Sequence, residues 1–195
     1  MDITEVMSLF SGFFYGKKVF MKNIKKLVWS AVFLALGLVL PFLTGQIPEI
    51  GSKLLPMHLP ILLCGFVCGW KYGLLVGFIT PLFRTVLFGM PPLMTAIGMA
   101  FELATYGAVT GIAYSRLAKS KARIYISLIA AMITGRVVWG LVSVILYGVS
   151  DAAFTWEIFL AGSLLNAIPG IILQLVAVPA LMLAFEKSGV VTIHE

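Results

Sequence analysis

The chain has 195 residues, of which 61% are hydrophobic and only 11% are charged, and it carries a net charge of +6 and a mean hydropathy of +1.06. A soluble domain has about 45–50% apolar and about 25% charged residues, and a fold of this size has too little interior to hide the excess. The composition excludes a soluble enzyme, a disordered chain and a secreted disulfide scaffold. It predicts an all-α integral membrane protein, because the strands of an outer-membrane barrel would alternate polar and apolar residues.

The apolar segments predict a bundle of six transmembrane helices. A helix that crosses the hydrocarbon core needs about 20 apolar residues. The apolar stretch 54–89 is too long for one helix and is expected to form two, separated at residues 69–73, with Pro56 and Pro60 making the start of the first irregular. The predicted spans are 27–43, two within 54–89, 94–114, 124–147 and 158–185.

One membrane domain of six helices is therefore expected over residues 24–186. Residues 1–23 contain too short an apolar run to span a membrane and are expected to be a cytoplasmic or interfacial extension, and residues 187–195 a cytoplasmic tail. Lysine and arginine concentrate on the cytoplasmic side of membrane proteins. Six spans with both termini cytoplasmic leave only Lys53 outside and place eleven basic residues inside: Lys17, Lys18, Lys22, Lys25, Lys26, Lys71, Arg116, Lys119, Lys121, Arg123 and Lys187.

Polar residues inside the spans are the candidates for function, since each is costly in hydrocarbon. At 1.5 Å per residue, Arg84, Glu102 and Arg136 each lie roughly 18 Å above the inner face. Asn166 falls at a similar level, and His58 lies near the outer end of its helix. Two arginines against one glutamate predict an outward-facing pocket that suits a carboxylate held by an arginine fork. The alternative is that Glu102 pairs with one arginine as structural support while Asn166 bridges helices.

Residues outside this group have weaker signals. The loop 44–56 is long enough to cover a site, and its polar residues Gln46, Glu49 and Ser52 are candidates for a lid. Trp139 belongs either to the interfacial aromatic belt or to a stacking contact with a ligand. The two cysteines are expected to be packing residues, so no metal site is predicted.

A further signal lies in the first span, where Ala31 and Ala35 stand four residues apart. Small residues at this spacing let another helix approach closely, either within the chain or from a partner.

These features together resemble the substrate-binding S components of energy-coupling factor (ECF) vitamin transporters. The resemblance covers residues 24–186 and rests on Ala31-x-x-x-Ala35 and on the loop 44–56 with its prolines and glycines. It extends through three further segments: Leu55-Pro-Met-His-Leu-Pro onward to Gly73, Phe88-Gly-Met-Pro-Pro, and Ala100-Phe-Glu-Leu-Ala-Thr-Tyr-Gly. The second and fourth spans look most like the pantothenate-type subgroup.

The resemblance implies a non-catalytic subunit of the cell membrane that binds a small vitamin from outside, with pantothenate as the first candidate. It implies docking through Ala31 and Ala35 onto a transmembrane coupling protein that carries two ATPase subunits. ATP would be used by those partners, because this chain contains no Gly-x-x-x-x-Gly-Lys-Ser/Thr motif. No cofactor in this chain and no nucleic acid partner are expected.

Two other classes of function compete with this interpretation. A self-contained secondary transporter or channel for a small anion would also contain intramembrane charges, but here they form no relay to the inner side. An intramembrane enzyme could use His58, Glu102 and Asn166, but neither a nucleophile elbow nor a His-Glu-x-x-His motif is present.

Overall fold

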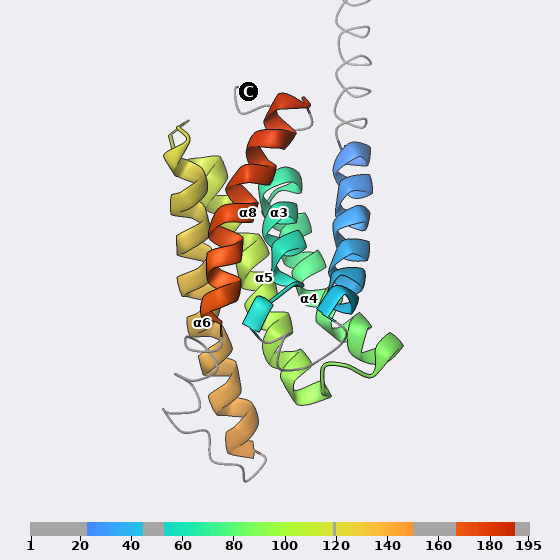
Figure 1. Ribbon diagram of the computed structural model, residues 1–195. Coiled ribbons are helices and arrows are strands. Elements are labelled where there is room, and N and C mark those ends of the chain that lie inside the picture. The colour runs from blue at the N-terminus through green and yellow to red at the C-terminus, as the bar shows by residue number, and fades with distance from the viewer. Residues whose placement is uncertain (1–22, 45–52, 119, 150–166, 190–195) are drawn as a thin grey trace, which may run out of the picture.

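The computed structural model describes residues 23–44, 53–118, 120–149 and 167–189. Within these ranges all regular secondary structure is helical, and the helices stand side by side in a bundle (Figure 1). The first described helix covers residues 23–39 and continues into a 3-10 helix, η1 (Leu40–Thr44). The other helices are α3 (His58–Cys68), α4 (Trp70–Phe88), α5 (Leu93–Arg116), α6 (Ala122–Val149) and α8 (Ile168–Lys187).

Five of these helices are long and apolar enough to cross a membrane: Asn23–Leu43, Trp70–Phe88, Leu93–Arg116, Ala122–Gly148 and Ile168–Lys187. The sixth, α3, is apolar but has only 11 residues. At 1.5 Å per residue it covers about 17 Å, roughly half the hydrocarbon core. The all-helical membrane architecture is therefore confirmed. The predicted last span began at residue 158, and its first nine residues lie outside the described ranges.

The predicted division of the stretch 54–89 is confirmed, and glycine explains its position. Gly69 separates α3 from α4 and has a φ of +92°, in the region where a side chain would be strained. The start of α3 is irregular, as the prolines predicted. A turn at Pro56 and Met57 precedes the helix, and the amide of His58 donates to the carbonyl of Leu55 at 3.0 Å.

Helix α5 is the centre of the described bundle. In its most apolar segment, half of the residues are buried, whereas only 22% are buried in the corresponding segment of Asn23–Leu43. Helices α3, α4 and α6 all pack against α5. Glycines make this packing close. A Cβ atom added at Gly107 of α5 would collide with the backbone of Gly73 of α4, and one added at Gly65 of α3 would lie 2.5 Å from the Gly107 carbonyl oxygen. Polar side chains of α5 are thereby held between three neighbours.

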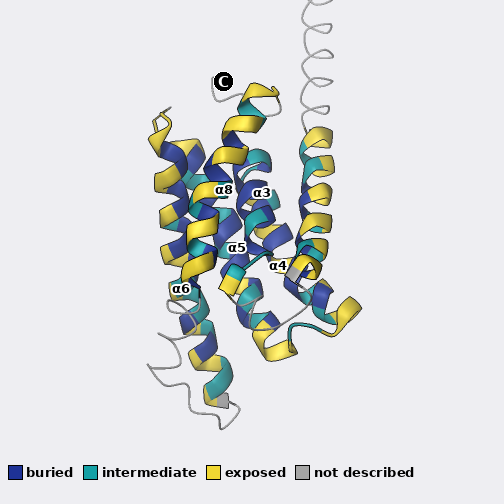
Figure 2. Cartoon of the chain, viewed as in Figure 1, coloured by how far each residue is buried: buried dark blue, intermediate teal, exposed yellow. Residues whose placement is uncertain are grey.

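The outer faces of the helices are apolar and exposed, while the buried residues face the bundle interior (Figure 2). In a soluble protein such an apolar surface would cause aggregation, but in a membrane it contacts lipid. The two described ends of the chain lie at the same end of the bundle (Figure 1). Lys71 at the start of α4, Arg116 at the end of α5 and Lys187 at the end of α8 belong to that same end.

Candidate functional site

A buried carboxylate on the central helix is the starting point of the site. Glu102 lies nine residues after Leu93, the first residue of α5, which places it about 14 Å along the helix. Its side chain is 2% exposed. An ionised carboxylate at this depth requires partners, because hydrocarbon offers no water to solvate it.

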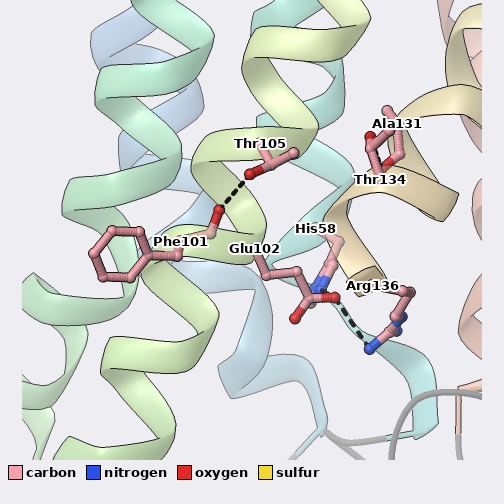
Figure 3. Close-up of polar contacts among 7 residues, drawn as sticks. All are labelled: His58, Phe101, Glu102, Thr105, Ala131, Thr134 and Arg136. Atoms are coloured by element: carbon pink, nitrogen blue, oxygen red, sulfur yellow. Dashed lines mark hydrogen bonds and ion pairs between the residues drawn. The ribbon is translucent and has the colours of Figure 1, made fainter. Parts of the chain in front are cut away.

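Two neighbouring helices supply those partners. Arg136 of α6 places Nη1 3.0 Å from Oε1 of Glu102, and His58 of α3 places Nε2 3.5 Å from the same oxygen. Figure 3 shows the carboxylate directed at both side chains. His58 is 1% exposed and Arg136 is 15% exposed. Three helices therefore meet at one charged contact.

Tyr106 completes this group, and the sequence-based prediction missed it. Its ring packs edge-on against the His58 ring at a centroid distance of 5.3 Å, and it fills the space that Gly135 leaves on α6. Tyr106 lies four residues after Glu102, so both side chains share one face of α5. That spacing was the available signal. We refer to His58, Glu102, Tyr106 and Arg136 as the Glu102 cluster.

The Glu102 cluster contains buried polar atoms without a hydrogen-bond partner among the described residues. They are Nδ1 of His58 and Nε and Nη2 of Arg136, whereas Oε1 of Glu102 is engaged by Arg136 and His58. A buried polar atom that makes no hydrogen bond costs about 1–3 kcal/mol. Native structures contain few such atoms, so several at one place indicate a site that a bound molecule completes.

The predicted partner Arg84 lies in a different environment. Its Nη1 donates to the carbonyl oxygen of Leu38 at 2.7 Å, where the first helix tightens into η1. Its guanidinium carbon lies 5.1 Å from the ring centroid of Phe42 and 5.6 Å from that of Phe88. Arg84 therefore links α4 to the end of the first helix, while Arg136 is the arginine that pairs with Glu102.

Trp139 lies in the layer next to the Glu102 cluster, toward the end of the bundle at which α5 begins. A Cβ atom added at Gly98 would lie 3.4 Å from Cδ1 and Nε1 of the Trp139 indole and 3.7 Å from Oγ of Ser143. Gly98 precedes Glu102 by one helical turn, and Trp139 follows Arg136 by nearly one turn. The indole therefore lies between the Glu102–Arg136 pair and the end of the bundle at which α5 begins.

The comparisons with known proteins identify the family. Residues 25–182 match the family described as the ECF transporter substrate-specific component. The chain belongs to this family. The comparisons with curated proteins and with solved structures gave no match.

As an S component, this protein is a transport subunit, and it is a multi-pass membrane protein. The predicted pair on its first helix is exposed: Ala31 and Ala35 both face away from the bundle, while Phe33 and Gly37 face inward. The inward face packs closely, since a Cβ atom added at Gly37 would lie 2.8 Å from Cγ2 of Thr80. Ala31 and Ala35 are thus unused by the described packing of this S component.

The predicted residue Asn166 and the predicted loop residues Gln46, Glu49 and Ser52 lie outside the described residues.

Gln174 on α8 was not predicted, although it is the only amide within that apolar helix. It is 1% exposed, and its Nε2 makes no hydrogen bond within the described part of the chain.

The two cysteines of the S component, Cys64 and Cys68, are buried on α3 and are not joined in a disulfide. The described residues contain no group of three or more His, Cys, Asp or Glu side chains that could hold a metal ion.

Proposed function

We propose that this S component binds a small water-soluble vitamin, with pantothenate as the best candidate, at the Glu102 cluster. The observation that carries the proposal is the set of buried, unpartnered nitrogen atoms on His58 and Arg136, beside Glu102, where three helices meet. A substrate-specific component needs a site that its substrate completes. Hydroxyl and amide groups of pantothenate match the donors and acceptors that these side chains present.

Further residues are proposed to surround the ligand. Trp139, whose indole lies against Gly98 one helical turn before Glu102, is proposed to stack on the ligand. Asn166 is proposed as a polar contact from the last span. The loop residues Gln46, Glu49 and Ser52 are proposed to cover the site from outside.

The same proposal includes the partners. Ala31 and Ala35 are proposed to contact a transmembrane coupling protein that carries two ATPase subunits, because their exposed, small side chains let a partner helix approach closely. ATP is then used by those subunits, and this chain needs no cofactor. The end of the bundle with Lys71, Arg116 and Lys187 is proposed to face the cytoplasm of the cell, together with the amino terminus.

A thermal-shift screen of the detergent-purified protein against water-soluble vitamins tests the proposal. A ligand that binds only the folded state stabilises it by about 2.7 kcal/mol at 100 times its Kd. We expect pantothenate to raise the melting temperature at submicromolar concentration. Stabilisation by another vitamin would replace the substrate and keep the function. Uptake by the chain alone in liposomes, driven by an ion gradient without ATP, would instead support the self-contained transporter.

A further inference from the structure

The unpartnered atoms of Arg136 occupy one particular edge of its guanidinium group. Nη1 contacts Glu102 at 3.0 Å, whereas Nε and Nη2 make no hydrogen bond within the described residues and have no exposed surface. In arginine, Nε and Nη2 form the side edge, on which two N–H bonds run parallel. That edge matches the two oxygens of a carboxylate, which it binds through two hydrogen bonds.

The neighbours of Arg136 hold this edge in place. The pair with Glu102 restrains one end of the guanidinium, and His58 approaches the same carboxylate oxygen. Tyr106 fills the space over Gly135, next to Arg136 on α6. An arginine restrained in this way loses little side-chain entropy when a ligand binds to it.

Arg84 differs from Arg136, because none of its nitrogens is a buried atom without a hydrogen-bond partner. Its Nη1 donates to the carbonyl of Leu38, and the rings of Phe42 and Phe88 lie against its guanidinium group. Its packing accounts for its burial without a ligand.

The charges of the cluster limit what Arg136 can bind. Arg136 and Glu102 balance each other in charge, so the cluster has no further arginine or lysine to face a second negative charge on a ligand. A doubly charged phosphate ester would leave an unbalanced charge in the low-dielectric interior.

We propose that the Nε/Nη2 edge of Arg136 binds the carboxylate of a singly charged substrate, and that Glu102 and His58 position this edge. The assignment rests on the proposed function, which it deepens by naming the class of substrate and the residue that selects it. It predicts discrimination between a monocarboxylate, its uncharged analogue and its phosphate ester.

The test measures the affinity of the purified full chain for matched compounds by calorimetry. The first pair is pantothenate and pantothenol, in which a hydroxymethyl group replaces the carboxylate, and the second is nicotinate and nicotinamide. We expect the protein to bind one carboxylate at least about 100-fold more tightly than its uncharged analogue, since a buried charge pair contributes strongly to affinity. We expect 4′-phosphopantothenate not to bind.

Variants show which residue causes the preference for a carboxylate over its uncharged analogue. Arg136→Lys keeps the charge but not the parallel edge, and should reduce carboxylate affinity about 10-fold or more. The double variant Arg136→Gln/Glu102→Gln removes both charges together and should bind the carboxylate no better than its uncharged analogue. Arg84→Lys and the control Arg123→Lys, a buried arginine in the first turn of the same helix α6, should both retain the preference.

Each other outcome overturns the assignment. If Arg136→Lys retains the full preference, or if Arg84→Lys loses it instead, a carboxylate is bound elsewhere and the proposed function survives. If the protein is stabilised only by an uncharged vitamin, the carboxylate assignment fails and the proposed function again survives. If no vitamin stabilises it, both fail.

Discussion

At the scale of single residues, the Glu102–Arg136 pair is a charge contact that the surrounding lipid makes obligatory. Removing one partner of a buried pair leaves an uncompensated charge and costs about 3–5 kcal/mol, whereas removing both is much less damaging. The two side chains come from different helices, so their mutual dependence also joins α5 to α6.

We therefore predict that Glu102→Gln lowers the apparent stability strongly, by about 3 kcal/mol or more, because the charge of Arg136 then has no anion. The double variant Glu102→Gln/Arg136→Gln should recover most of that loss. Melting temperatures of the four proteins of this double-mutant cycle measure the coupling. Glu186→Gln, near the end of α8, is the matched control and should change stability little. Additive losses in the cycle would contradict the pairing.

Sequence-based depth arithmetic could not resolve this pair. It placed Arg84, Glu102 and Arg136 at one level, but a rise per residue gives no rotation about the helix axis. Arg84 points toward Leu38, and Arg136 points toward Glu102. Gln174 was missed for a related reason, since a lone polar residue in an apolar helix shows its partners only when the neighbouring helices are placed.

At the scale of helices, the α4–α5 contact depends on glycines at the points where the backbones meet. Gly73 and Gly77 of α4 face Gly107 and Leu103 of α5, and each glycine lies where a Cβ atom would overlap backbone atoms of the other helix. Backbone atoms cannot rotate away as a flexible side chain can. The close approach of α4 therefore fixes the position of α5, which carries Glu102.

Gly107→Ala should consequently separate α4 from α5 and destabilise the protein by about 1–3 kcal/mol, the typical effect of overpacking. Gly148→Ala on α6 is the matched control, because no atom of the described residues lies within 4 Å of its added Cβ atom. The control should be neutral or slightly stabilising, since alanine favours helix by up to about 1 kcal/mol over glycine. Melting temperatures in one detergent compare the two, and equal shifts would mean that the contact tolerates a methyl group.

The helices themselves were largely predictable, because length and hydropathy determine a membrane span. The boundary between α3 and α4 was predicted because Gly69 interrupts the apolar stretch. The ends of α5 and α6 lie within about two residues of the predicted ends. The exact start of α3, which the sequence predicted to be a short helix, was the harder feature. Its apolar residues continue from the turn at Pro56 to Cys68, but only the structure shows that the helix begins at His58.

At the scale of the whole molecule, two surfaces are separate. The Glu102 cluster is enclosed by α3, α5 and α6, whereas Ala31 and Ala35 lie on the outside of the first helix. That helix is the least buried of the five candidate spans, because only 22% of its most apolar segment is buried in the bundle. Binding and docking can then be disturbed independently.

This separation leads to the prediction that Ala35→Leu leaves ligand affinity of the isolated protein unchanged but lowers ATP-dependent uptake at least about 10-fold in vesicles that contain the whole transporter. A leucine adds bulk where a partner helix must come close, and small residues at such contacts are poorly replaced by large ones. Ala180→Leu, an equally exposed alanine on α8, is the matched control and should retain uptake. Affinity is measured by calorimetry and uptake with radiolabelled pantothenate.

If Ala35→Leu transports like the parent, the coupling protein docks on another face. If it loses ligand affinity as well, the first helix contributes to the binding site, and the two surfaces are not independent.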